Sequence, residues 1–328
     1  IYDSDVFDIL VVDEAAQLSV AALQRLVERH TDAHIVFATT THGYEGTGRG
    51  FTLRFLEWLE GRDVPVDNLR LREPIRWDSG DPVETFVFDA LLLDAEPASL
   101  TEKPRLDAVE HVHLDRDELA EDEARLRELF GLLVQAHYRT TPGDLHRLLD
   151  APNLDVHASL WNGHVVGATL VAREGGLTEE LCDELYRGGR RILGHALPES
   201  FVSHLGYRDA GRLEMIRSVR IAVHPDTRRL GIGTQLVEHV HDSYQPDLFG
   251  TLFGATPELL RFRRSVGYEL GRVSASRNHR TGEPSVMMLR PVSDEARKLA
   301  DAIRGHLARE LPLRIELMEA GHQLPVDS

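Results

Sequence analysis

The distribution of apolar positions predicts strands and helices that alternate along the first part of the chain. Residues 6–12 (VFDILVV) and 34–38 (HIVFA) are mostly apolar and have the pattern of buried parallel strands. Residues 17–30 lie between them and place leucine, valine and alanine on one helical face. A strand, a helix and a strand within about 30 residues predict a βαβ unit of an α/β nucleotide-binding layer. A polar, Gly-rich loop over 39–51 and a helix over 52–59 follow.

The pattern then becomes irregular. Residues 72–82 carry prolines and no periodicity, residues 83–93 favour a short helix, and residues 95–105 contain two more prolines. We therefore expect a first module over 1–75 and a linker over 76–107.

A second regular region extends over 108–291. An apolar stretch at 111–114 predicts a strand, and residues 118–136 form an amphipathic helix. Thr141 and Pro142 have the residue types of an N-cap and a first helical position. Strands are also expected at 157–161, 165–172, 214–223, 248–254 and 285–289, and helices at 231–240 and 257–265. The turn Asn162-Gly163 joins the first two of these strands as a hairpin, and a charged helical tail over 292–328 closes the chain.

Composition limits the class of protein. The chain has 328 residues, 42% of them hydrophobic, which is enough for two domains. It contains no apolar run of about 18–20 residues that would span a membrane and no signal peptide. The single cysteine, Cys182, leaves no intramolecular disulfide and no Cys-rich zinc site. We expect a cytoplasmic location, no membrane partner and no resident metal site.

The net charge of −17 has two possible origins. An acidic surface that repels nucleic acid is one. The other is adaptation to high salt, as in halophilic archaea, which agrees better with the fact that only Lys103 and Lys298 among the 37 basic residues are lysines. Under the second explanation, which we favour, the charge neither supports nor excludes an RNA partner.

The stretch RSVRIAVHPDTRRLGIGTQLVEHV, residues 217–240, carries the most informative motif. A predicted strand ends at Val223, and Arg228, Gly231 and Gly233 then precede a helix in the order R-x-x-G-x-G. Loop glycines before a helix let backbone N–H groups and the helix dipole converge on an anion. An ordinary Gly-rich turn is the alternative, but the full segment resembles the pyrophosphate-binding signature of the Gcn5-related N-acetyltransferases (GNAT).

That resemblance implies an acetyl-CoA site with three parts. The backbone of Ile221, Ala222 and Val223 would pair with the pantetheine arm, and charged residues of the helix expected at 257–265 would flank the CoA exit. The residues around the pyrophosphate would be Arg228, Arg229, Leu230, Gly231, Ile232, Gly233 and Thr234, and those at the exit Glu258, Arg261 and Arg264. Many enzymes of this class carry a tyrosine that protonates the thiolate, but here Phe262 is followed by Arg263, so the usual acid is missing.

Five sequence blocks that occur in a fixed order narrow the resemblance from the GNAT class to one family within it. DEAAQL, GYEGTGRGF, LREPIRW…DPVE, AHYRTTPGDLHRLLDAP and the glycine loop occur in this order. The string is similar to the tRNA(Met) cytidine acetyltransferase family, which includes the eukaryotic RNA cytidine acetyltransferases. The resemblance implies an α/β protein: a partial RecA-like ATPase module, a GNAT-type acetyltransferase domain over 108–291 and a helical tail that could bind RNA. It also implies acetylation of cytidine N4 in RNA, either tRNA or ribosomal RNA, with acetyl-CoA and ATP.

The first block, ILVVDEAAQL, matches the acidic end of a Walker B strand. By resemblance, Asp13 would hold Mg²⁺ through water, Glu14 would orient the attacking water, and Arg49 would contact the ATP phosphates. Asp13 and Glu14 could instead cap a helix, and Arg49 could be a surface arginine. The phosphate-binding Gly-Lys-Ser/Thr loop has no room in the eight residues before Ile9. We therefore expect an N-terminally truncated chain that binds acetyl-CoA but binds ATP weakly or not at all.

The resemblance assigns the acetyl-transfer chemistry to His137 and Tyr138. Cytosine N4 is a poor nucleophile and needs a base to take its proton, which suits histidine at neutral pH. Tyr138 would stack on or hydrogen-bond the base. Without the family block, the simpler interpretation of His137 would be a helix-end cap or a surface residue.

Two other functions remain possible from the residues. The same fold could acetylate a protein or a small-molecule amine, or the chain could be an inactive acetyl-CoA-binding fragment. The ATPase block favours the RNA enzyme over ordinary amine acetyltransferases.

Overall fold

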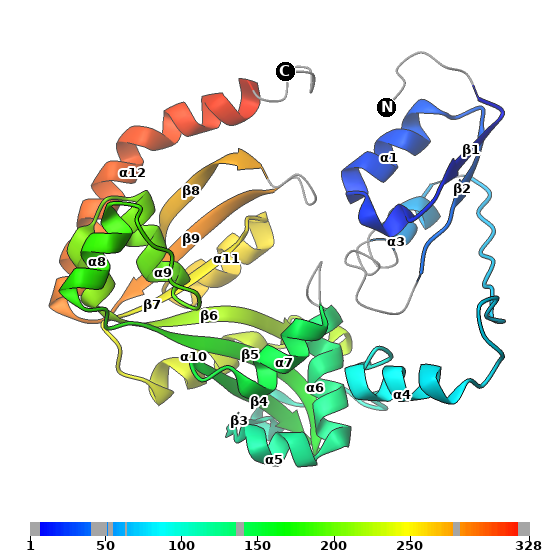
Figure 1. The fold of residues 1–328 in the computed structure, drawn as a ribbon, viewed down its shortest axis with the longest axis horizontal. Coiled ribbons are helices and arrows are strands. Elements are labelled where there is room, and N and C mark those ends of the chain that lie inside the picture. The colour runs from blue at the N-terminus through cyan, green and yellow to red at the C-terminus, as the bar shows by residue number, and fades with distance from the viewer. Residues whose placement is uncertain are drawn as a thin grey trace.

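The protein is described here by a computed structural model, which defines residues 7–40, 51, 55–62, 64–135, 141–277 and 283–320. Its strands form a two-stranded parallel sheet near the N-terminus and a seven-stranded sheet in the rest of the chain. Figure 1 shows the two sheets as separate layers, joined through the connection that contains helix α4 (Pro82–Leu91). None of the helices in the part of the chain that the structure defines is long and apolar enough to cross a bilayer.

The N-terminal sheet confirms the predicted βαβ unit. Strand β1 (Ile9–Val12) pairs with β2 (His34–Phe37), and helix α1 (Val20–Arg29) connects them. The helix begins three residues later than expected because the Ser19 hydroxyl accepts a hydrogen bond from the Ala22 N–H at 3.2 Å. α1 and the short helix α3 (Leu56–Glu60) enclose a small core on one face of the sheet.

Helix α4 and the residues after it are tied to the second sheet's helical layer. Asp81 caps α4 by accepting from the Val83 and Glu84 N–H groups. The guanidinium of Arg127 then forms ion pairs with Asp89 at 2.8 Å and with Asp94 at 2.7 Å. The predicted linker is therefore anchored where it reaches helix α6 (Glu123–Gln135), which carries Arg127.

The seven-stranded sheet has the order β3-β4-β5-β6-β7-β9-β8. All neighbouring strands are antiparallel except β6 and β7, which are parallel. The predicted hairpin is confirmed, with Asn162 at φ 50° and Gly163 at φ 85° in its turn. The strands are β3 (Glu110–Leu114), β4 (Leu154–Trp161), β5 (His164–Gly175), β6 (Glu214–Val223), β7 (Leu248–Gly254), β8 (Glu269–Arg277) and β9 (Pro284–Pro291).

Helices cover both faces of this sheet. Leu170 and Val171 are adjacent on β5, so they point to opposite faces and join two different apolar cores. One core packs under α6, and the other packs under helix α10 (Ile232–Ser243). Helices α5 (Arg116–Glu121), α7 (Pro142–Asp150) and α11 (Pro257–Ser265) also cover this sheet.

One predicted helix and several unpredicted elements differ from the sequence expectation. The single helix expected over 118–136 is wrong, because the chain breaks at Asp122, whose carboxylate accepts from the Arg125 N–H at 3.0 Å and restarts the helix as α6. Elements that the sequence pattern did not predict are the strand β8 and the helices α8 (Glu179–Tyr186) and α9 (Ala196–Glu199). The predicted C-terminal helix is present as α12 (Asp294–Ala320) and packs on β8.

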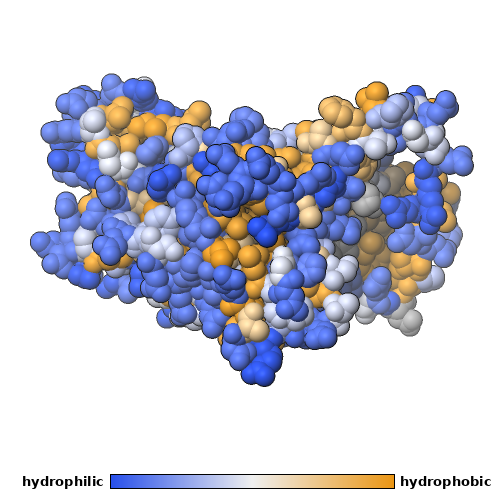
Figure 2. All heavy atoms as spheres, turned by 90° about the horizontal axis from the view of Figure 1, so that it is seen from below, coloured by the Kyte–Doolittle hydropathy of each residue, from blue (hydrophilic) through white to orange (hydrophobic). Residues whose placement is uncertain are grey.

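The surface agrees with the acidic composition. Figure 2 shows a face that is mostly hydrophilic, with apolar side chains gathered in a few patches. A few large apolar side chains are nearly fully exposed, such as Ile75 at 98% and Leu193 at 97%.

Candidate functional site

The central feature of the site is a gap that opens between the two parallel strands. β6 and β7 pair from Met215 and Leu248 as far as Ser218 and Thr251. Beyond that point β6 continues to Val223, and no further pairing between β6 and β7 is formed in the described residues. The edge of residues 221–223 that faces β7 therefore has no neighbouring strand, and its backbone groups can pair with an extended ligand.

A bulge in β6 lies at the start of the gap. On the β5 side, Leu170 pairs with Arg220 and Val171 pairs with Ser218, so Val219 is an extra residue. A bulge bends the strand that carries it and increases the local twist. The bend therefore falls where β6 leaves β7.

The buried side chain of His224 anchors the loop that follows β6. His224 is 3% exposed, and its Nδ1 accepts from the Asp226 N–H at 3.3 Å. Its Nε2 therefore carries the proton and donates to the Ala98 carbonyl at 2.7 Å. This bond joins the loop to the linker that precedes β3.

The loop ends in an uncapped helix. Arg229 and Gly231 have positive φ values of 65° and 94°, and α10 begins at Ile232 with no side-chain cap and no acidic residue in its first turn. The first N–H groups of a helix have no intrahelical partner, and the dipole favours an anion beside them. A pyrophosphate fits this donor set, since Arg228 and Arg229 are exposed next to it.

Glycine allows the close packing of this loop and helix. A Cβ on Gly231 would lie 3.1 Å from the Leu106 Cδ2 atom, and a Cβ on Gly233 would lie 3.2 Å from Val223 Cγ2 and 3.6 Å from Phe262 Cε2. The start of α10 is therefore next to both the end of β6 and helix α11. The structure brings residues 221–223 and 228–234 together as expected.

Three further predicted residues lie on the outside of α11. Glu258, Arg261 and Arg264 are all exposed, and Arg261 forms an ion pair with Glu258 at 3.4 Å. Both arginines are free to reach a phosphate at the surface of the site, because an exposed ion pair is weak.

The expected catalytic pair, His137 and Tyr138, lies outside the described residues, as does Arg49. The helix that follows the pair is described. Thr141 and Asp144 form the capping box of α7, and Asp144 forms an ion pair with Arg220 of β6 at 2.8 Å. Burial alone would raise the pKa of Asp144, but the charge of Arg220 and the hydrogen bonds from Thr141 outweigh it and lower that pKa. α7 is thus attached to β6 beside Ile221, a contact that the sequence reasoning missed.

The two acidic residues of the first block follow β1 directly. Asp13 and Glu14 are exposed, and Glu14 adopts a left-handed conformation with φ 49°. Ser19 caps α1, whereas Glu14 occupies the N-cap position of the short 3₁₀ turn Ala15–Gln17, where its side chain forms no capping hydrogen bond. Both carboxylates lie at the carboxyl end of a parallel strand, where α/β sheets bind ligands.

Comparison with known proteins supports these observations. Residues 2–94 match the family model described as "RNA cytidine acetyltransferase NAT10/TcmA, helicase domain", and residues 128–248 match "GNAT acetyltransferase 2". A protein of Nitrosococcus halophilus named tRNA(Met) cytidine acetyltransferase TmcA is 46% identical over 93% of this chain and 41% of its own length. The chain belongs to this acetyltransferase family.

Archaeal proteins of the same name are also similar. The protein of Haloferax volcanii is 46% identical over 90% of this chain and 39% of its own length. The protein of Methanopyrus kandleri is 39% identical over 89% of this chain and 35% of its own length. The chain thus spans about two fifths of the length of the relatives that it matches. Within that span, the fold is a mixed α/β acetyltransferase sheet preceded by part of a helicase-type domain.

A cluster of histidines under α10 in the acetyltransferase sheet was not predicted. His157 of β4 is fully buried, its Nε2 lies 2.9 Å from the Tyr244 hydroxyl, and that hydroxyl donates to Asp155 at 2.9 Å. His157 therefore donates through Nε2, and its buried Nδ1 has no partner. The rings of His113 and His239 lie 4.6 and 5.3 Å from it. In the described part of the chain, no three histidine, cysteine or acidic side chains are arranged to hold a metal.

This cluster predicts acid sensitivity. Burial, with the nearby charges of His113 and His239, lowers the pKa of His157 to about 3. The unfolded histidine binds a proton near its ordinary pKa of about 6.5. Between these two pKa values the unfolded state holds more protons than the folded state. The contribution of His157 to the unfolding free energy is therefore fully present above about pH 6.5 and falls by about 1.4 kcal/mol per pH unit below it.

The measurement is the unfolding free energy in urea at a series of pH values. His157→Gln is expected to flatten the slope between pH of about 6.5 and 4. His146→Gln, at a histidine whose side chain is 76% exposed, is the control and should leave the slope unchanged. Equal slopes in the wild type and His157→Gln would contradict the assignment.

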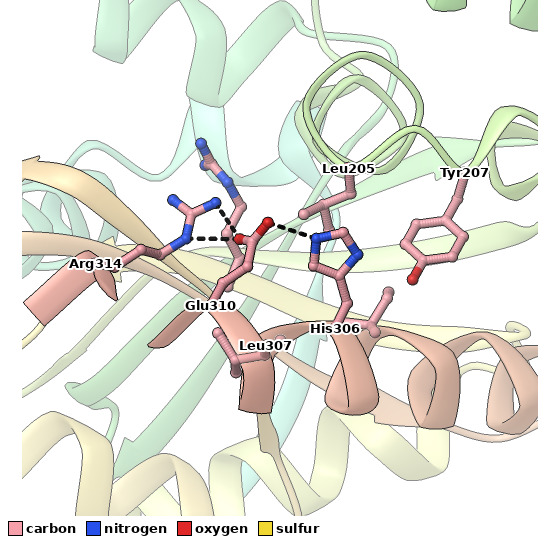
Figure 3. A pocket seen from close by; sticks show the side chains of 9 residues that line it. Leu205, Tyr207, His306, Leu307, Glu310 and Arg314 are labelled. Carbon is pink, nitrogen blue, oxygen red and sulfur yellow. Dashed lines mark hydrogen bonds and ion pairs between the residues drawn. The ribbon is translucent and has the colours of Figure 1, made fainter. Parts of the chain in front are cut away.

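A small pocket lies between α12 and β8, away from the gap between β6 and β7 (Figure 3). Glu310 accepts from His306 at 2.6 Å and from Arg314 at 2.6 Å, and Arg314 also donates to the Val273 carbonyl at 3.1 Å. These contacts attach the end of α12 to β8, and the polar groups of Glu310 are satisfied within the chain. None of the predicted site residues lines this pocket.

Proposed function

We propose that the chain is the acetyl-transfer part of an RNA cytidine N4-acetyltransferase that acts on tRNA in the cytoplasm. The observation that carries the proposal is the gap between β6 and β7, followed directly by the uncapped start of α10. This arrangement fits the pantetheine arm and the pyrophosphate of acetyl-CoA. The names of the relatives supply the class of acceptor.

The proposed division of labour follows the chain. Residues 1–75 belong to an ATPase module, 76–107 to a linker, 108–291 to the acetyltransferase domain and 292–328 to a tail that contacts RNA. In the ATPase module, Asp13 and Glu14 would bind Mg²⁺·ATP together with Arg49. Their exposure at the end of β1 supports this role.

In the acetyltransferase domain, the residues divide between binding and proton transfer. The backbone of residues 221–223 and the loop 228–234 would orient acetyl-CoA, and Arg261 or Arg264 would meet its outer phosphate. His137 would take the proton of cytosine N4, and Tyr138 would hold the base. The ion pair between Asp144 and Arg220 supports this placement because it attaches the helix after His137 to the edge of the gap.

The test is acetylation of a tRNA transcript by this chain, with acetyl-CoA carrying a labelled acetyl group and with or without Mg²⁺·ATP. We expect N4-acetylcytidine in the digested nucleosides, and about 10²- to 10⁴-fold less product with His137→Ala. Label found on protein lysines or on an added polyamine, with none on cytidine, would contradict the RNA acceptor. Because this chain is expected to bind ATP weakly or not at all, product that forms equally with and without ATP would show that acetyl transfer by this chain does not need ATP binding.

A further inference from the structure

Arg263 on α11 is a buried cation without an anionic partner in the described part of the chain. The residue is 5% exposed, and its Nη2 donates to the Ser218 hydroxyl at 2.8 Å. Its Nη1 is buried and has no hydrogen-bond partner among the described residues. Within the described residues, Arg263 forms no ion pair with a carboxylate. Two aromatic rings lie near the guanidinium, whose Cζ is 5.5 Å from the ring centroids of Phe262 and of Tyr268.

Such an arrangement is costly unless an anion completes it. A guanidinium removed from water loses more hydration free energy than contacts with aromatic rings return. Burial accordingly lowers the pKa of Arg263, with only the Tyr268 hydroxyl opposing it. The free Nη1 donor and the uncompensated charge together indicate that this position is built for a negative charge that the described residues do not supply.

The guanidinium lies where the gap of the candidate site begins. Its partner Ser218 forms the last pair between β6 and β7, with Thr251. The Thr251 hydroxyl also donates to the Ser218 carbonyl at 3.2 Å, so the end of the paired region is fixed from both strands. Beyond it, residues 221–223 present the unpaired edge that the proposed pantetheine arm would follow.

We propose that Arg263 stabilises the negative charge that acetyl transfer leaves on the sulfur of CoA. The inference rests on the acetyl-CoA site proposed above. It gives Arg263 the place that a tyrosine holds in many acetyltransferases of this class, with a different chemistry. A tyrosine hydroxyl delivers a proton, whereas a guanidinium keeps its protons and offers charge and N–H donors.

The step balances without a further reagent. The amino nitrogen of cytosine forms a bond to the carbonyl carbon of the thioester, and its proton passes to the base. The carbon–sulfur bond breaks, and its electron pair leaves on sulfur as a thiolate. Arg263 then meets that thiolate with a positive charge and the free Nη1–H, so sulfur can leave before it takes a proton from water.

The test is the pKa of the CoA thiol when CoA itself is bound to this chain. Thiolate formation is followed by its ultraviolet absorbance as the pH is raised, with saturating CoA. We expect the bound thiol to titrate about one to three pH units below free CoA. Arg263→Met should return the pKa to the value of free CoA or above it, and Arg263→Lys should keep most of the shift. Arg187→Met, at an exposed arginine of the α8 end, is the control.

The outcomes separate this inference from the proposed function. If calorimetry detects no CoA binding to the wild-type chain, the proposed acetyl-CoA site fails. If CoA binds and its thiol pKa is unchanged or raised, the site stands and the role of Arg263 is overturned. This second result needs no variant, so it holds even if Arg263→Met does not fold. An unchanged pKa in a folded Arg263→Met protein would overturn the role equally.

Discussion

Glu174→Ala is expected to lower the free energy of unfolding by about 3–5 kcal/mol, because it breaks a buried ion pair from one side. The Glu174 side chain is fully buried at the end of β5, and its Oε1 accepts from the Arg217 Nε at 2.6 Å. Its Oε2 accepts from the Leu197 N–H at 2.8 Å, in the first turn of α9. The alanine variant leaves a guanidinium that is only 12% exposed without its anion, and a buried N–H without its acceptor.

Equilibrium unfolding in urea, followed by circular dichroism, measures this effect. The double variant with Glu174→Leu and Arg217→Leu removes both charges and should be less destabilised than Glu174→Ala. Arg187→Ala breaks an exposed ion pair with Asp183 and should cost less than about 1 kcal/mol. A loss below about 1 kcal/mol for Glu174→Ala would show that the pair contributes no more than a surface contact.

The elements that the sequence predicted correctly depend on nearby residues. The βαβ unit follows from two apolar runs and one helical face, and the hairpin follows from Asn162-Gly163, whose positive φ values suit a two-residue turn. The loop before α10 was predicted for the same reason, because a glycine at φ 94° and a helix start are both local features. In such segments the short-range pattern and the tertiary structure agree.

The elements that were missed depend on tertiary contacts or on weak patterns. β8 is an edge strand that pairs only with β9, so it needs no continuous apolar run and gives no periodic signal. The break at Asp122 interrupts an apolar face that continues in α6, so periodicity alone could not locate it. For α8 a local signal existed, since Thr178 accepts from the Leu181 N–H as an N-cap.

The candidate site divides in the same way. Its contiguous part, the end of β6 and the loop to α10, was predicted from one motif. Its other contacts join residues far apart in the chain, as in Ser218 with Arg263 and Asp144 with Arg220. The sequence identified Arg263 only as a residue in place of a tyrosine. Its burial and its missing anion are properties of the packing of α11 against the sheet, which no residue pattern expresses.

Gly231→Asp is expected to weaken CoA binding about 10- to 100-fold relative to Gly231→Asn. Gly231 is the residue before α10, where the helix start has no side-chain cap and no acidic residue in its first turn. Asparagine and aspartate have the same shape, and both tolerate a positive φ better than most residues. The two variants therefore share the strain at φ 94° and the close approach to Leu106, so the difference between them is one negative charge.

That charge would lie beside the phosphates in the proposed complex. Two unit charges about 4 Å apart repel each other by about 4 kcal/mol near a protein surface, and mobile ions screen part of this energy. The measurement is calorimetric titration of each variant with CoA at low and at high salt, where the difference between them should shrink. Gly163→Asp, at a turn glycine with φ 85° and open space around it, controls for an added charge and should bind CoA as the wild type does. Equal affinity of Gly231→Asp and Gly231→Asn at low salt would move the pyrophosphate away from the start of α10, and with it the orientation of acetyl-CoA on which the role of residues 221–223 depends.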